Sequence, residues 1–521
     1  MARILVTEQL AERGLAAMRA GGHDVEVQVG LNPEQLLDAV AGAAALVVRS
    51  ATAVTAAVLE AGTQLVVVGR AGIGLDNVDV ATATRRGVMV VNAPQSNVLS
   101  AAEHTMALLL AQARNVPQAH AALTAGKWER SRWEGVELHG KTLGVIGLGR
   151  VGALVAQRAH AFGMRLVAYD PYVSPDRARQ MGVELTGLEE LVAQADFVTI
   201  HLPKTPETLG LIGRDLLAQA RPGLRIVNTA RGGIVDEAAL EEAIASGRVA
   251  GAALDVFNAE PTTASPLFEL PSVVVTPHLG ASTAEAQDKA GVTIAEQVLL
   301  ALAGEFVPYA VNVSATEASE TVRPFLPLAE RLGRIFGSLV GGLPTKLDVE
   351  YEGALAEYDT SILTLAVLKG LFATGTAEPV SYVNAPQLAR ERGLEYRESK
   401  SSTSRDWVNL IMLRSAEHSL AGTLHGMRGE PRIVVVDDHV TEVPPARHML
   451  VVRNDDRPGR IAVVSTALGD AGINIADMDV GRSPGGATAL MVIATDQAVP
   501  EHVLERLNGA PGILDLRRIE G

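Results

Sequence analysis

The chain has 521 residues, more than one ordinary hydrophobic core supports, so we expect several domains. Hydrophobic residues make up 47% and charged residues 20%, which is typical of globular rather than disordered proteins. The net charge of −15 argues against nucleic acid or an anionic membrane as the main partner, and the absence of cysteine excludes disulfides and thiolate chemistry.

The N-terminal apolar run ends before Glu8, which is too short for a signal peptide, and no later run has the length of a membrane span. We therefore expect a cytoplasmic protein with no membrane partner. No cysteine is present to hold a metal, and we expect no metal cofactor.

The first part of the chain alternates short Val/Leu/Ile-rich runs with helical or turn segments, a pattern that indicates a parallel sheet covered by helices. The expected strands are 3–7, 24–29, 45–49, 64–68 and 88–91. Ser100-Ala-Ala-Glu103 then has capping-box spacing, which predicts the start of a helix that runs to about residue 114.

From Gly140 the alternation of strand, glycine turn and helix starts again, and it predicts a doubly wound domain over 97–284 that is inserted into the first domain. A helical pattern over 285–304 favours a return to the first domain, which would then comprise 1–96 and 285–312. The expected elements between are a helix at 151–162 and strands at 165–169, 196–201, 224–228, 249–254 and 273–275.

A polar, small-residue segment at 314–320 predicts a linker. This linker opens a third region, 313–446, for which we expect an α+β domain. Its expected elements are helices at 325–340, 361–372 and 384–393, a polar loop at 398–405, and paired strands at 407–413 and 419–425. The last region, 447–521, has the pattern strand, helix, strand, strand, helix, strand of a small α+β sandwich.

A glycine fingerprint, Gly147-Leu-Gly-Arg-Val-Gly152, follows a buried strand and opens a helix. The glycines permit a tight turn, close approach of a pyrophosphate and helix–strand packing, while the helix N-terminus attracts phosphate. Asp170 ends the next strand at the spacing expected for a contact with a ribose diol. A glycine motif alone is weak, but with Asp170 it predicts NAD as the cofactor and disfavours NADP.

Three loop residues downstream supply the parts of a hydride-transfer site. His278 suits proton transfer near neutral pH, and Glu260 could orient its ring and stabilise the imidazolium. Arg231 could hold a substrate carboxylate and polarise the adjacent carbonyl. Each is a weak signal alone, but each follows an apolar run, where strand ends meet a cleft.

The chain resembles the D-2-hydroxyacid dehydrogenases and, within them, the long-type phosphoglycerate dehydrogenases. The resemblance is carried by Val67–Asp79, the glycine fingerprint, Asn228–Glu237, Ala253–Phe257 and Thr276–Thr283. It implies a Rossmann-like cofactor domain inserted in a flavodoxin-like substrate domain, with Arg231, Glu260 and His278 as catalytic residues. It also implies cofactor contacts from Gly147, Gly149, Arg150, Val151, Gly152, Asp170, Leu202, Thr229, Ala230, Arg231, Asp255, His278, Gly280 and Ala281.

The same resemblance implies that the substrate is an anionic phosphorylated hydroxy acid, D-3-phosphoglycerate, oxidised in the first step of L-serine synthesis. Trp128 is expected to pack on a second subunit of a homo-oligomer, a dimer or tetramer. The residues expected at the substrate are Arg49, Ser50, Arg70, Gly72 and, reaching in from that second subunit, Arg130.

Residues 447–521 resemble an ACT domain, a small-molecule sensor, through Asn454–Gly459 and Ala471–Ile475. The resemblance implies L-serine as an inhibitor, bound through Asp456 and Asn474. Three alternatives remain open: another D-2-hydroxyacid dehydrogenase, an enzyme that also reduces 2-oxoglutarate, and an NAD-sensing regulator like the C-terminal-binding corepressors.

Overall fold

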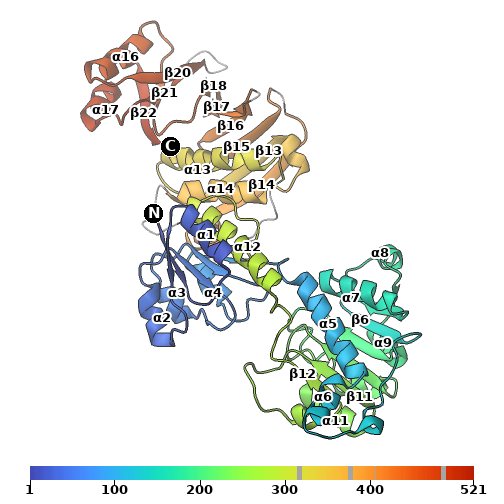
Figure 1. Cartoon of the computed structure of the whole chain (residues 1–521). Helices are drawn as coiled ribbons and strands as arrows, with labels where there is room; N and C mark the ends of the chain where they lie inside the picture. Colours follow the sequence, from blue (N-terminus) through green and yellow to red (C-terminus); the bar gives the residue numbers. More distant parts are fainter. Residues whose placement is uncertain (314–318, 374–379, 405, 427, 483–487) are drawn as a thin grey trace.

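The computed structural model describes residues 1–313, 319–373, 380–404, 406–426, 428–482 and 488–521. These residues form four β-sheets that follow one another along the chain (Figure 1). The linker expected at 314–320 falls largely outside the described residues. Among the described helices, none has the length and apolar character needed to cross a membrane.

The first sheet has five parallel strands in the order β2-β1-β3-β4-β5, with helices on both faces. Its central strand β3 is apolar throughout because both faces of the sheet are buried there. This order confirms the flavodoxin-like first domain. The elements are β1 Arg3–Val6, α1 Glu12–Ala20, β2 Asp24–Val27, α2 Pro33–Val40, β3 Ala45–Val48, α3 Ala56–Ala61, β4 Val67–Arg70, α4 Val80–Arg85 and β5 Met89–Asn92.

The second sheet has seven parallel strands in the order β12-β11-β10-β9-β6-β7-β8. The order reverses between β6 and β9, the position where doubly wound sheets bind nucleotides. Its elements are α5 Val98–Ala113, α6 Val116–Thr124, β6 Thr142–Ile146, α7 Arg150–Ala161, β7 Arg165–Tyr169, α8 Pro175–Gln180, β8 Glu184–Leu185, α9 Leu188–Gln194, β9 Phe197–Ile200, α10 Arg214–Gln219, β10 Leu224–Asn228, α11 Glu237–Ala245, β11 Val249–Leu254 and β12 Val273–Val275.

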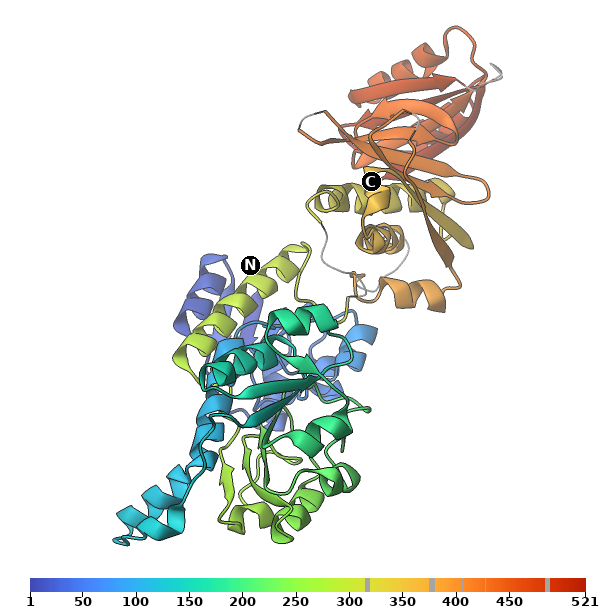
Figure 2. The same cartoon turned by 90° about the vertical axis from the view of Figure 1, so that its right-hand side faces the viewer.

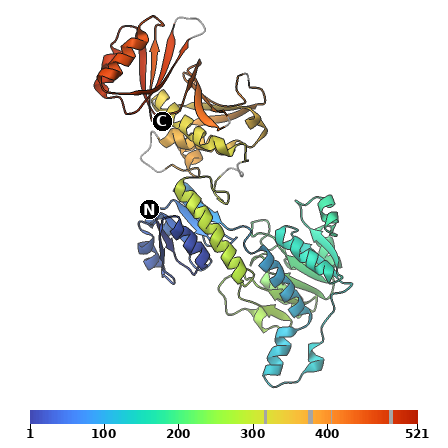
Figure 3. The same ribbon diagram turned by 45° about the horizontal axis from the view of Figure 1, so that its top comes forward.

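The long helix α12, Ala284–Ala303, follows the second sheet but packs against the first (Figure 3). Ala290, Ile294 and Val298 share one hydrophobic core with Ile4 and Val67. Since α5 packs on α7 and the second sheet, the chain passes between the two sheets twice, before α5 and before α12. On this basis we propose the domain limits given above, with 97–284 inserted between 1–96 and 285–312.

The capping box expected at Ser100 is wrong. Helix α5 begins earlier, at Val98, with Asn97 as N-cap residue and no side-chain cap. Ser100 lies in the first turn, where its hydroxyl shares a hydrogen bond of 2.8 Å with the hydroxyl of Thr283. Its polar side chain therefore connects the two crossover segments instead of capping the helix.

The third region is a mixed six-stranded sheet in the order β14-β13-β15-β16-β17-β18, covered by helices. The polar loop expected at 398–405 is partly wrong, because 395–401 form the edge strand β14, whose exposed polar side chains hide its alternation. The elements are α13 Leu326–Val340, β13 Lys346–Gly353, α14 Ser361–Ala373, α15 Ala385–Glu391, β14 Glu395–Ser401, β15 Asn409–Arg414, β16 Ser419–His425, β17 Glu430–Val436 and β18 His439–Val443.

The last region has the expected order of strands and helices and an antiparallel sheet in the order β20-β21-β19-β22. One face carries its two helices, while Met449, Val451 and Val492 on the other join the core around α13. The third and last regions therefore share a continuous apolar contact. The elements are β19 His448–Asn454, α16 Arg460–Asp470, β20 Ile475–Arg482, β21 Ala489–Thr495, α17 Glu501–Asn508 and β22 Ile513–Glu520.

The contact between α1 and α12 gives a stability prediction. A Cβ on Gly14 would lie 2.6 Å from the backbone oxygen of Gly291, so Gly14→Ala must push the helices apart. We expect a loss of about 1–3 kcal/mol, seen as a lower Tm for the first domain by calorimetry. Gly469→Ala, in α16 with open space around the new methyl group, is the matched control. An unchanged Tm for Gly14→Ala would contradict this packing.

Candidate active site

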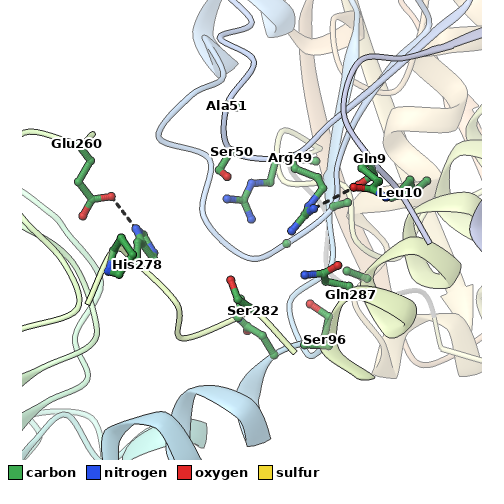
Figure 4. Close-up of a pocket in the computed structure, with 18 of the residues that line it drawn as sticks. Gln9, Leu10, Arg49, Ser50, Ala51, Ser96, Glu260, His278, Ser282 and Gln287 are labelled. Carbon is green, nitrogen blue, oxygen red and sulfur yellow. Dashed lines mark hydrogen bonds and ion pairs between the residues drawn. The ribbon is translucent and has the colours of Figure 1, made fainter. Parts of the chain in front are cut away.

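A cavity of about 410 Å³ lies where loops after the strands of the first two sheets meet the crossover segments. Arg49, Ser50, Arg70 and Gly72 line it from the first sheet. Glu260 and His278 line it from the second. Figure 4 shows the Glu260–His278 pair on one side of the cavity and Arg49 with Ser50 on the other. The cavity thus brings two arginines together with the His278–Glu260 pair.

His278 and Glu260 form a direct pair. The Nδ1 of His278 lies 2.6 Å from Oε2 of Glu260, and the other carboxylate oxygen accepts a 2.8 Å hydrogen bond from the amide of Phe257. Partial burial acts to raise the pKa of Glu260, but the hydrogen bonds from His278 and Phe257 outweigh it and hold that pKa below its ordinary value. Glu260 is therefore suited to orient an imidazole and to stabilise its cation.

Asp255, at the end of β11, fixes the loop that carries His278. Its side chain is fully buried and accepts hydrogen bonds from the hydroxyl of Thr276 at 2.6 Å and from the amides of Leu279 and Gly280 at 2.7 and 2.8 Å. Its backbone oxygen accepts the amide hydrogen of His278, whose φ of 55° is left-handed. These contacts hold a conformation that is unfavourable for a side chain larger than glycine.

The same carboxylate reaches α5, since Nε2 of His104 lies 3.1 Å from Oδ1 of Asp255. Burial acts to raise the pKa of Asp255, but the hydrogen bonds from His104, Thr276 and Leu279 lower it overall. The family resemblance implies that Asp255 lies beside the cofactor. In the structure its carboxylate also binds the His278 loop and His104 of α5.

Arg231 lies in a tight turn after β10, shaped by Asn228. The side-chain Nδ2 of Asn228 donates to the backbone oxygen of Arg231 at 3.0 Å, and its Oδ1 accepts from the backbone N–H of Ala230 at 3.1 Å. A side chain on Gly232 would collide with the backbone of Phe257, so only glycine lets this turn approach the loop of Glu260. Arg231 itself is not among the residues that line the cavity, and its guanidinium donates a hydrogen bond of 2.7 Å to the backbone oxygen of Ala230.

Arg231 also connects the two sheets, because its Nε lies 3.3 Å from Oδ2 of Asp76 in the loop after β4. The charges of Arg231 and Asp76 both act on the pKa of Arg70. Burial lowers the pKa of Arg70, Arg231 lowers it further, and Asp76 opposes this. The guanidinium of Arg70 folds over Gly72, where a side chain would collide with it.

The glycine fingerprint forms the turn between β6 and α7. Gly147 has a φ of 93°, and a Cβ there would lie 2.9 Å from the side chain of Leu202. A Cβ on Gly152 would collide with the backbone oxygen of Gly147, whereas Gly149, the N-cap of α7, faces open space. A cradle with two tight glycines and one open one, at the start of a helix that continues with Arg150 and Val151, fits a dinucleotide pyrophosphate.

Asp170 follows β7 and contacts the backbone of the glycine turn. Its carboxylate accepts hydrogen bonds from the amides of Leu148 at 2.8 Å and Tyr172 at 2.9 Å, so it holds the glycine turn in place. Further along the sheet, Thr229 bonds Thr105 of α5 through hydroxyls 2.6 Å apart. Of the other expected cofactor residues, Ala281 lines the cavity.

Two groups of expected residues lie elsewhere in this single chain. Arg130 begins a short 3-10 helix, Arg130–Trp133, beyond α6, on an arm that projects from the second sheet (Figure 2). Trp128 on the same arm is 83% exposed. In the last region, Asp456 pairs with Arg482 at 3.4 Å, and the amide hydrogen of Asn474 bonds Asp496 at 3.2 Å. Neither group lines the cavity.

Several lining residues were not anticipated from the sequence. These residues belong to no motif. Their positions after β1 and in the crossover segments could have predicted them, because such segments lie at the carboxyl ends of the strands, where the cleft forms. They include Gln9, Ser96, Asn97, Ser282 and Gln287.

Family comparisons agree with this architecture. The NAD binding domain of D-isomer specific 2-hydroxyacid dehydrogenases matches residues 106–280. The D-3-phosphoglycerate dehydrogenase intervening domain matches 321–437, and the ACT domain matches 448–512.

Similar solved structures cover the first two sheets. The TT0316 protein from Thermus thermophilus has a TM-score of 0.56 and 37% identity, covering 59% of this chain and 99% of that one. D-lactate dehydrogenase from Aquifex aeolicus, complexed with NAD and lactic acid, has a TM-score of 0.52 and 26% identity, covering 58% of this chain and 96% of that one.

Curated relatives match over nearly the full length. D-3-phosphoglycerate dehydrogenase of Mycobacterium tuberculosis is 50% identical over 507 residues, covering 96% of each chain. The proteins of the same name from Archaeoglobus fulgidus and Bacillus subtilis are 44% and 38% identical and cover 99% and 100% of this chain, and 100% of each relative. The chain therefore belongs to the D-3-phosphoglycerate dehydrogenase family and is an NAD-dependent oxidoreductase with a C-terminal ACT domain.

Proposed function

We propose that this chain oxidises D-3-phosphoglycerate to 3-phosphohydroxypyruvate with NAD, the first step of L-serine synthesis. The observation that carries the proposal is the single cavity with Arg49 and Arg70 on one wall and the His278–Glu260 pair on the other. A substrate with a phosphate at one end and a secondary alcohol beside a carboxylate matches this distribution of charge. The names of the full-length relatives support the same substrate.

Oxidation of the alcohol needs a base for the hydroxyl proton while a hydride leaves carbon. The glycine turn Gly147–Gly152 would hold NAD, which would supply the hydride acceptor. His278 takes the proton at Nε2, because its Nδ1 is hydrogen-bonded to Glu260. The carboxylate of Glu260 then stabilises the imidazolium, and Arg231 holds the substrate carboxylate beside the reacting carbon.

We propose that the expected cofactor residues contact the dinucleotide along its length. Gly147, Gly149, Arg150, Val151 and Gly152 would hold the pyrophosphate, and Asp170 the ribose. The remaining proposed contacts are Leu202, Thr229, Ala230, Asp255, Gly280 and Ala281.

A homo-oligomer completes the proposed site. The arm that carries Trp128 and Arg130 projects from the second sheet, and its tryptophan is largely exposed (Figure 2). A large exposed aromatic is typical of an interface. We therefore propose that Trp128 packs on a second copy of the chain and that Arg130 adds a positive charge to that copy's active site.

The substrate assignment predicts a selective effect of Arg49→Ala. NADH formation followed by absorbance should show activity with D-3-phosphoglycerate for the native chain. In the variant, KM should rise about 10–100-fold for D-3-phosphoglycerate, because a charge-assisted contact with phosphate is lost, and much less for unphosphorylated D-glycerate. Equal changes for the two substrates would contradict a phosphate site at Arg49.

The catalytic pair predicts distinct effects of two substitutions. His278→Gln removes the base and should lower kcat about 10²–10⁴-fold. Glu260→Gln keeps an acceptor for the ring but removes the charge that stabilises the imidazolium formed during oxidation, so kcat should fall about 10–100-fold, less than for His278→Gln, while KM changes little. Steady-state kinetics of the purified variants measure both effects. An unchanged kcat for Glu260→Gln would argue against an electrostatic role for Glu260.

The ACT domain supports regulation by an amino acid, and we propose L-serine as the inhibitor, bound through Asp456 and Asn474. Titration of L-serine against the initial rate should show inhibition by millimolar L-serine but not D-serine. Asp456→Ala should raise the L-serine concentration for half-inhibition about tenfold or more, because one charged contact with the amino group is lost. Full activity at millimolar L-serine would refute this proposal.

A further inference from the structure

A carboxylate that belongs to no motif holds the loop after β3. Glu8, just beyond β1, accepts hydrogen bonds from the amide hydrogens of Arg49 at 2.8 Å, Thr52 at 2.9 Å and Ala51 at 3.2 Å. Three contacts of this kind fix the backbone path of residues 49–52. Glu8 itself does not line the cavity.

The same loop is held from its other side by Asn77. Its side-chain amide donates to the backbone oxygens of Arg49 at 2.8 Å and Thr52 at 2.6 Å. Glu8 therefore accepts from the backbone N–H groups of this loop, and Asn77 donates to its backbone oxygens. We call this pair of contacts, from Glu8 and Asn77 to the backbone of residues 49–52, the clamp. Glu8 follows β1, the clamped loop follows β3 and Asn77 follows β4, so the clamp depends on three neighbouring strands of the first sheet.

The clamped loop presents Arg49 and Ser50 to the cavity, opposite His278 and Glu260 (Figure 4). The guanidinium of Arg49 is turned by a hydrogen bond of 3.2 Å to the backbone oxygen of Gln9, the residue after Glu8. One short segment, Glu8–Gln9, thus controls both the backbone and the side-chain direction of Arg49.

Glu8 carries a negative charge close to the proposed phosphate site. Such a charge weakens anion binding unless hydrogen-bond donors or positive charges offset it. Here the carboxylate oxygens are engaged by amide hydrogens. Glu8 is also among the charges that oppose the lowering of the pKa of Arg70, which burial and Arg231 cause. It therefore favours a charged Arg70 while it orders the neighbouring loop.

We propose that Glu8 and Asn77 are positioning residues for the substrate phosphate, acting through the backbone of Arg49–Thr52. This inference rests on the proposed function and deepens it. Phosphate recognition then depends on a loop whose shape is set by two side chains outside the cavity.

The test compares D-3-phosphoglycerate with D-glycerate, which lacks only the phosphate, in the full-length enzyme. Glu8→Ala and Asn77→Ala should each raise KM for D-3-phosphoglycerate about tenfold, with kcat, KM for D-glycerate and KM for NAD changed less than about twofold. Glu8→Gln keeps one acceptor oxygen and should restore part of the affinity. Inorganic phosphate, used as a competitive inhibitor, should bind more weakly to Glu8→Ala in parallel.

Glu60→Ala on α3 removes an exposed carboxylate and is the matched charge control. If Glu8→Ala lowers Tm and raises KM equally for both substrates, or if it lowers KM for D-3-phosphoglycerate, the positioning role is wrong. A poorly folded Glu8→Ala leaves Asn77→Ala and Glu8→Gln to decide by the same KM comparison. Absence of native activity on D-3-phosphoglycerate would instead refute the proposed function, whereas a response to Arg49→Ala alone would refute only the clamp.

Discussion

The buried carboxylate of Asp255 is the interaction on which the site depends. Four groups converge on it, from Thr276, Leu279, Gly280 and His104. Three of them fix the loop that turns His278 towards Glu260, and the fourth joins that loop to the crossover helix α5. A carboxylate that is fully buried is stable only with such partners. The position of His278, the proposed base, is therefore coupled to the junction between the first two sheets.

Charge is distributed in the site by pairing. Arg70 and Arg231 lie close to each other, and Asp76 offsets both charges, since it bonds Arg231 and favours the cation of Arg70. Glu8 also favours the cation of Arg70, but its carboxylate binds backbone amides of the Arg49 loop and no guanidinium. Carboxylates beside the arginines reduce their mutual repulsion in the absence of substrate. The chain can then hold Arg49 and Arg70 in the lining of a small cavity although its net charge is −15.

Much of the fold was predictable because most strands of the two parallel sheets are apolar runs in the sequence, and the glycine fingerprint marks the turn between β6 and α7. The sequence predictions failed where polar residues have tertiary partners. Ser100 has the spacing of a capping residue but bonds Thr283, far away in the chain. Strand β14 has exposed polar side chains and is recognisable only by its pairing with β13.

The class of chemistry could be inferred from the sequence alone, because Arg231, Glu260 and His278 stand in loops after apolar runs downstream of a dinucleotide-binding turn. Which other residues join them depends on the tertiary fold. Gln9, Ser96 and Gln287 reach the cavity only because the chain crosses between the sheets twice, and Glu8 meets Arg49 only because β1 and β3 are neighbours. Such contacts arise from strand order, which brings distant segments to one edge of a sheet and leaves no local periodicity to read.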